Sequence, residues 1–198
     1  MPGPDPQAPR LAPSLLDALP SPTPRPVLPP MPSPMVGPTL FHEDFEQGMG
    51  RWHASAGPGD AGWHLLRAAA CGGLYTMVLG RDHNDVFTNV ATTADLTLKM
   101  PLDLTRLRRP HLQYDLKGLC YPYDLLTIRP YARRPGGVWK PVGAAGQARY
   151  PLVVTFAADL TPFAGGLIEL RFHGEMRAGS KPNRGLYLDD INVLETAR

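Results

Sequence analysis

Acidic side chains lie near both ends of the part of the chain that can form a core. The first group is Glu43, Asp44 and Glu46, and the second is Asp189 and Asp190. Calcium takes about six to eight oxygen ligands, many of them carboxylates. Carboxylates that meet without a cation repel one another, and their pKa values rise. If the two groups converge, we expect calcium to bind there and to serve stability rather than bond-making.

Strand alternation indicates where some of these acids point. In the last expected strand Ile191 and Val193 fit the core face, so Asp189 should share that face. In the first strand Phe45 should face inward, and Glu43 shares its face. A core-facing carboxylate is costly unless it is paired or binds a cation. Asp189 alternatively pairs with an arginine or accepts backbone amides, and the sequence leaves these readings open.

Aromatic rings are the candidates for ligand contact, because flat rings stack on the C–H faces of sugars. Tyr121 and Tyr123 flank a proline in an expected loop, where exposed rings more often bind ligands, and Tyr131 lies in a central strand. We take these three as candidate ligand-binding residues. Most other rings are expected to fill the core, and Trp139 most of all.

Motifs for catalysis are absent from the sequence. The segment 42–46 begins like a zinc-protease motif but ends in Glu, and it lies in a strand pattern rather than a helix. The segment 57–62 matches the dinucleotide fingerprint in letters, yet no βαβ pattern surrounds it. No nucleophile elbow, phosphate loop or legible pair of facing carboxylates is present. We therefore expect that the chain is not an enzyme.

The composition divides the chain. Of its 24 prolines, 14 lie in residues 1–39, which disfavours helix and sheet and favours extended polyproline II. We expect a disordered, proline-rich arm or linker over residues 1–38 and one folded domain over 39–198. The net charge of +2 is too balanced for a nucleic-acid partner, and no apolar run is long enough to span a membrane. Cys71 and Cys120 are either one disulfide or two buried thiols.

Residues 40–198 show short runs of β-branched and aromatic residues separated by turn signals, and no convincing helical periodicity. This pattern predicts an all-β fold, an antiparallel β-sandwich of the jelly-roll type. The tripeptides Asp103-Leu104-Thr105 and Asp159-Leu160-Thr161 each predict a turn in which a side chain caps the following backbone. The expected strands are Leu40–Phe45, Gly62–Leu66, Leu74–Leu79, Leu96–Met100, His111–Lys117, Leu125–Ala132, Val138–Val142, Leu152–Phe156, Leu167–His173 and Leu186–Leu194.

Several phrases in this order resemble a known kind of module. The segment 41–46, followed by Gly48, Gly50 and Trp52, is similar to the opening of meprin-type and immune inhibitor A-like jelly rolls and of related carbohydrate-binding jelly rolls. The segments 98–105, 138–142, 159–172 and 185–193 resemble their later strands and turns. The meprin-type domain carries a fixed set of cysteines, whereas this chain has only two. The difference favours the bacterial, protease-associated or glycan-binding relatives.

The resemblance implies a non-catalytic binding module for a glycan or a protein surface, extracellular or at the cell surface. Such a module is accessory to a secreted enzyme or acts in adhesion. In the resembled jelly rolls the first and last strands are neighbours, and Glu46 and Asp189 match the calcium ligands, with Glu43 as a further candidate. A hydrolase on a jelly roll and a purely structural cap are the alternatives. No signal peptide is visible in this sequence. The sequence does not indicate which ligand binds or which oligomer forms.

Overall fold

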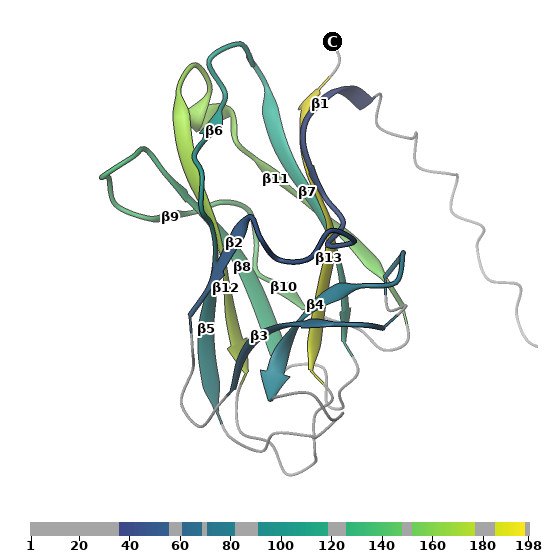
Figure 1. The fold of residues 1–198 in the computed structure, drawn as a ribbon. Helices are drawn as coiled ribbons and strands as arrows, with labels where there is room; N and C mark the ends of the chain where they lie inside the picture. Colours follow the sequence, from purple (N-terminus) through teal and green to yellow (C-terminus); the bar gives the residue numbers. More distant parts are fainter. Residues whose placement is uncertain are drawn as a thin grey trace, which may run out of the picture. The chain divides into compact units, whose positions relative to one another are not determined.

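A computed structural model describes residues 36–198 with gaps at 56–60, 69–70, 82–90, 119–125, 148–151, 177–184 and 197–198. The expected arm therefore lies almost wholly outside the described residues. The folded unit is an antiparallel β-sandwich of two sheets (Figure 1), as the turn-separated strand pattern predicts. The described helical structure is one 3-10 turn, η4 (Thr161–Phe163).

The two sheets interleave segments that are distant in the sequence. One has the order β11-β7-β13-β4-β3, with β1 also pairing to β13, and the other has the order β10-β8-β12-β5-β2, with β6 on β12 and β9 on β8. The strands are β1 (Val36–Glu43), β2 (Trp52–Ala54), β3 (Ala61–Leu66), β4 (Thr76–Arg81), β5 (Thr92–Leu98), β6 (Leu102–Asp103), β7 (Pro110–Gly118), β8 (Leu126–Arg133), β9 (Lys140–Pro141), β10 (Gly146–Gln147), β11 (Val154–Asp159), β12 (Leu167–Met176) and β13 (Leu186–Thr196).

The core lies between the sheets and follows from alternation. Along β7 every second residue is buried, because one face of the strand packs inward. Aromatic rings join the two layers: Trp52 of β2 lies 6.2 Å from Phe45 and 6.0 Å from Phe172 of β12, between ring centroids. Phe172 in turn meets Tyr114 of β7 edge to face at 5.2 Å. These contacts tie the sheets into one core.

The two Asp-Leu-Thr turns form as the sequence predicts. The backbone amide of Thr105 donates to Asp103 Oδ1 at 2.9 Å, and that of Thr161 donates to Asp159 Oδ1 at 2.8 Å. The hydroxyl of each threonine, and then its backbone amide, favours the charged carboxylate and lowers the pKa of both aspartates. The middle leucine of each turn, Leu104 or Leu160, is fully buried, so each turn also closes one end of the core.

The last strand contains a β-bulge, which corrects the face predicted for Asp189. The register of β13 against β7 shifts between Asp189 and Asn192, and Asp190 has a left-handed backbone with φ of 47°. An extra residue in one strand shifts the alternation by one. Leu188 and Ile191 both face the core as a result, so Asp189 lies on the outer face, opposite Asp115 of β7. Asp189 is nevertheless buried on that outer face, at 1% exposure.

Candidate functional site

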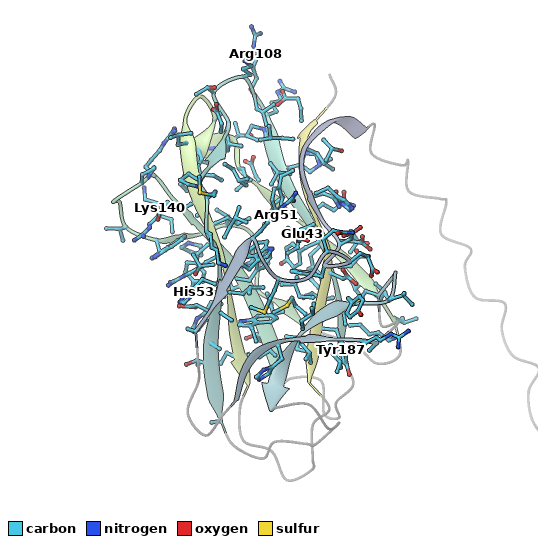
Figure 2. All side chains as sticks on the ribbon, in the orientation of Figure 1. Glu43, Arg51, His53, Arg108, Lys140 and Tyr187 are labelled. Carbon is cyan, nitrogen blue, oxygen red and sulfur yellow. The ribbon has the colours of Figure 1, made fainter. Side chains whose placement is uncertain are left out.

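Polar and aromatic side chains cover the outer face of the β8-β12-β5 sheet. Along β12 the residues Leu170 and Phe172 point into the core, and Glu169, Arg171 and His173 alternate with them on the outer face. Register places Tyr131 of β8 and Thr97 of β5 on either side of Arg171, with His53 of β2 beyond Thr97. The next row holds Arg129, His173 and Asp95. Figure 2 labels His53 on this side of the molecule.

Arg171 is the centre of this face. Its Nη1 donates to Asp95 Oδ2 at 2.9 Å, and its guanidinium carbon lies 5.1 Å from the ring centroid of Tyr131 and 4.6 Å from that of Trp139. Such cation–π contacts hold a guanidinium while leaving in-plane N–H groups for other partners. The other Asp95 oxygen lies 2.7 Å from Nδ1 of His173, whose ring meets Tyr131 edge to face. One carboxylate therefore orients two side chains.

The prediction that Trp139 lies in the core is wrong. It is half-buried and lies outside the core, in the segment between β8 and β9, and its neighbour Val138 is 81% exposed. Its ring packs on Arg171 and on Arg133, whose guanidinium carbon is 4.3 Å from the ring centroid. Arg133 Nε also donates to Glu169. The two arginines thus cover part of the Trp139 ring on the protein surface, and the rest of the ring stays accessible.

The three predicted ligand-binding tyrosines have different outcomes. Tyr131 lies on this outer face, half-buried, between His173 and Arg171. Tyr121 and Tyr123 lie outside the described residues, so they stay predictions. Sequence reasoning missed Arg171, Asp95 and His173 altogether. The charged residues that alternate with Leu170 and Phe172 were the available signal for a polar outer face.

A second group of polar residues lies on the outer face of the other sheet, around the bulge. Burial, together with the negative charges of Asp190, Glu46 and Asp115 and against a hydrogen bond from the Asp190 amide, raises the pKa of Asp189 to about 7. Glu46 Oε1 accepts the backbone amides of Leu74 and Tyr75 at 2.6 and 2.8 Å. The charge of Glu46 acts on Asp189, and the expectation that the two residues hold calcium stays a prediction.

Glu43 lies apart from that group. Its Oε2 accepts the indole N–H of Trp52 at 3.1 Å, and its Oε1 accepts the backbone amide of Phe45 at 3.1 Å. Both oxygens are therefore engaged, inside the sandwich. Glu43 and Phe45 do share the inward side, as alternation predicted, although β1 ends at Glu43 and Phe45 has a φ of 57°.

The fit of calcium to the Glu46 and Asp189 group is mixed. The shared electrostatic repulsion around Asp189 is what a bound cation would relieve. Within the described ranges, however, no set of three or more His, Cys, Asp or Glu side chains is arranged to hold a metal ion. Two carboxylates and nearby backbone carbonyls are the donors on offer. Glu43 does not belong to this set.

Cys71 lies beside the same group. Its thiol is half-buried and free, and burial, assisted by the negative charge of Asp189, raises its pKa to about 12. Cys120 lies outside the described residues, so the conditional disulfide stays a prediction. A thiol of such a high pKa remains protonated and unreactive near neutral pH.

Comparison with solved structures finds the same fold in carbohydrate-binding modules. TmCBM61, solved in complex with β-1,4-galactotriose, has a TM-score of 0.57 at 14% identity and covers 77% of this chain and 94% of its own. The xylan-binding CBM22-1 domain of Xyn10C from Paenibacillus barcinonensis has a TM-score of 0.52 at 17% identity, over 82% of this chain and 98% of its own. The mannan-recognising module TmCBM27 has a TM-score of 0.50 at 13% identity, over 80% and 98%.

These likenesses establish the fold, a jelly-roll β-sandwich. They give no support to the meprin-type or immune inhibitor A-like naming. No protein-family model matches the sequence, and no curated protein matches it either. In the described part of the chain, no helix has the length and hydropathy needed to cross a membrane.

Proposed function

We propose that this chain is a non-catalytic glycan-binding module that binds its ligand on the outer face of the β8-β12-β5 sheet. The observation that carries the proposal is the arrangement around Arg171, which combines two aromatic rings with a fixed guanidinium and carboxylate. A glycan offers C–H faces for stacking and hydroxyls that both donate and accept. Trp139 and Tyr131 supply the first kind of contact, and Arg171 with Asp95 supplies the second.

Pre-organisation supports this site. The Asp95, Arg171 and His173 side chains are held by hydrogen bonds of 2.7 to 2.9 Å and by ring contacts on strands of one sheet. Side chains that are already fixed lose little conformational freedom when a ligand binds. The fold likeness to modules described as binding galactotriose, xylan and mannan makes β-1,4-linked glycans the first class to test.

The test is binding of the full chain to β-1,4-galactan, xylan and mannan by affinity electrophoresis and calorimetry. We expect binding to at least one of them, lost in Trp139→Ala and kept in Arg108→Gln. Arg108 is exposed and lies at the far end of the sandwich from His53 in Figure 2, which makes it a suitable control. Binding to none of the three, or binding unchanged in Trp139→Ala, would overturn the proposal.

Hydrolysis is the alternative that this face disfavours. Its carboxylates Glu169 and Asp95 are each engaged in an ion pair with an arginine, Arg133 and Arg171. A glycoside hydrolase needs two carboxyl groups that face the scissile bond. We expect no release of reducing ends from any glycan that the chain binds. Measurable, protein-dependent release would favour a hydrolase.

Calcium and location complete the proposal. We propose a structural calcium ion held by Glu46 and Asp189 with backbone carbonyls, supported by the raised pKa of Asp189 among neighbouring carboxylates. The ion would stabilise the sandwich and take no part in chemistry. We further propose that the module works outside the cell, accessory to a secreted enzyme or at a cell surface, where polymeric glycans occur.

A further inference from the structure

A groove opens on one side of the sandwich, between the edge strand β1 of one sheet and the β5–β6 turn of the other. Its volume is about 640 Å³, in the range that small ligands and peptide side chains fill, which is roughly 300–1,000 Å³. Leu40 and His42 line it from β1, Arg51 from the segment before β2, and Lys99 and Met100 from the turn. It shares no lining residue with the Arg171 face, whereas its His42 also lies near Asp190 in the carboxylate group around Asp189.

The groove exposes apolar side chains that a soluble domain normally covers. Leu40 is 43% exposed and Met100 is 74% exposed, and the rest of the apolar lining is aliphatic apart from Phe41. Methionine is flexible and polarisable, and it adapts to partners of different shape. Two large apolar side chains that share one concave surface favour a partner with apolar side chains of its own.

The charged lining is cationic. Lys99 Nζ donates to the carbonyl oxygen of Gly50 at 2.8 Å, and Arg51 Nη1 donates to that of His42 at 3.0 Å. Carbonyls orient these groups without neutralising them. No carboxylate lines the groove itself, although Glu43 forms an ion pair with Arg51 at 4.0 Å and Asp44 Oδ2 lies 3.6 Å from Nε2 of the lining residue His42. Figure 2 labels Glu43 and Arg51 in this central region.

The backbone of β1 offers an edge for strand pairing. Among the described strands, β1 pairs with β13 alone. The carbonyl of His42, a residue that lines the groove, accepts a hydrogen bond from the Arg51 side chain. Free backbone groups on an edge strand are a template for an extended peptide.

We propose that this groove receives an extended peptide in which acidic and apolar side chains alternate. A backbone N–H of the peptide takes the place of Arg51 on the His42 carbonyl, which frees the guanidinium to bind a peptide carboxylate. Lys99 binds a second carboxylate, and the apolar side chains pack on Leu40 and Met100. A glycan fits less well, because its hydroxyls need acceptors as well as donors, and His42 is the only lining side chain that can accept.

The experiment uses a capped nonapeptide of alternating Glu and Val, titrated into the full 198-residue chain and followed by calorimetry and by amide shifts. Two matched probes separate the contributions: a Lys/Val nonapeptide reverses the charge, and alternate N-methylation of the Glu/Val peptide removes backbone donors. We expect binding of the Glu/Val peptide alone, with shifts at Leu40, His42 and Met100. Lys99→Gln should weaken it about two- to fivefold, as for an exposed ion pair, and Arg108→Gln should not.

Three results would overturn the proposal. One is failure of the Glu/Val peptide to bind, and another is equal binding of the Lys/Val or N-methylated peptide. The third is the same amide shifts produced by an acidic oligosaccharide such as oligogalacturonate and not by the peptide. Lys99 is exposed, so its substitution should leave the fold intact. Unchanged thermal unfolding of Lys99→Gln would show that weaker binding does not reflect misfolding.

Discussion

Glu43 and Trp52 join the first strand of one sheet to the first strand of the other through a buried hydrogen bond of 3.1 Å. The second oxygen of the same carboxylate holds the amide of Phe45, a fully buried residue in a left-handed conformation that bulky side chains rarely adopt. One acidic side chain therefore fixes both the turn after β1 and the ring at the centre of the core.

Replacing Glu43 by leucine should destabilise the fold. Two buried donors, the Trp52 indole and the Phe45 amide, would lose their acceptor, at a cost of about 2–5 kcal/mol together. Glu43→Gln keeps one acceptor oxygen and should cost less. Urea unfolding of both variants, with Trp52→Phe to complete a double-mutant cycle, measures the coupling. Additive effects of Glu43→Leu and Trp52→Phe would contradict the pairing.

Replacement of three glycines by alanine should destabilise the fold to different degrees. An alanine at Gly73 would adopt a φ of 53° and overlap Glu46 Oε1, whereas one at Gly136 would adopt a φ of 73° in open space. One at Gly50 would meet neither difficulty. We expect losses of unfolding free energy in the order Gly73→Ala, Gly136→Ala, Gly50→Ala, with about 1–2 kcal/mol for strain alone. Equal losses at Gly73 and Gly136 would show that Glu46 is not fixed there.

Truncation of the rings around Arg171 should separate binding from stability. Trp139→Ala and Tyr131→Ala each remove a half-buried ring, and we expect about tenfold or greater loss of glycan affinity with a small change in unfolding free energy. Calorimetry and thermal unfolding of the same samples give the two quantities. A large fall in melting temperature with unchanged affinity would make these rings structural.

Calcium should raise the melting temperature of the chain, by an amount equivalent to about 2.7 kcal/mol at a hundredfold excess over Kd. Asp189→Asn and Glu46→Gln should abolish the rise. Glu43→Gln should retain it, because the Glu43 oxygens face Trp52 and Phe45 rather than Asp189. Identical unfolding in calcium and in chelator would rule out the site.

Without calcium, Asp189 should make stability fall as the pH rises. Its pKa is about 7 in the folded chain, raised chiefly by burial, against an ordinary 3.8. Between these values the folded state holds a proton that the unfolded state has lost, so this group's contribution is full below about pH 4 and is lost as the pH rises through about 7. The slope is at most about 1.4 kcal/mol per pH unit. The difference between the parent chain and Asp189→Asn, measured in chelator, isolates the effect, and a difference independent of pH would refute it.

Local sequence signals predicted much of the sandwich. The alternating segments became β7, β12 and β13, and turn chemistry placed Asp103 and Asp159 correctly, because these features depend on neighbours within a few residues. The short strands β2, β6 and β10 were missed, since two or three residues carry no readable period. Their existence depends on pairing with β5, β12 and β8.

The candidate site was largely unpredictable because its contacts join distant parts of the sequence. Asp95 and Arg171 lie 76 residues apart and meet only through strand register. The prediction for Trp139 was wrong because a tryptophan is usually buried in the core, whereas this ring packs on Arg133 and Arg171 at the outer face. The face of Asp189 was predicted wrongly, because the bulge that turns it outward has no signature in the alternation pattern itself.

That bulge gives β13 one position at which its length can change. Leu188 and Ile191 are three positions apart and both lie in the core, which a regular strand does not allow. Deleting Asp190 would restore regular alternation and leave Leu188, Ile191 and Val193 on the core face. Deleting one residue from the regular part of the strand on either side would instead send part of β13 to the wrong face. Position 190 should therefore tolerate loss of the residue, as well as any side chain that accepts a left-handed backbone.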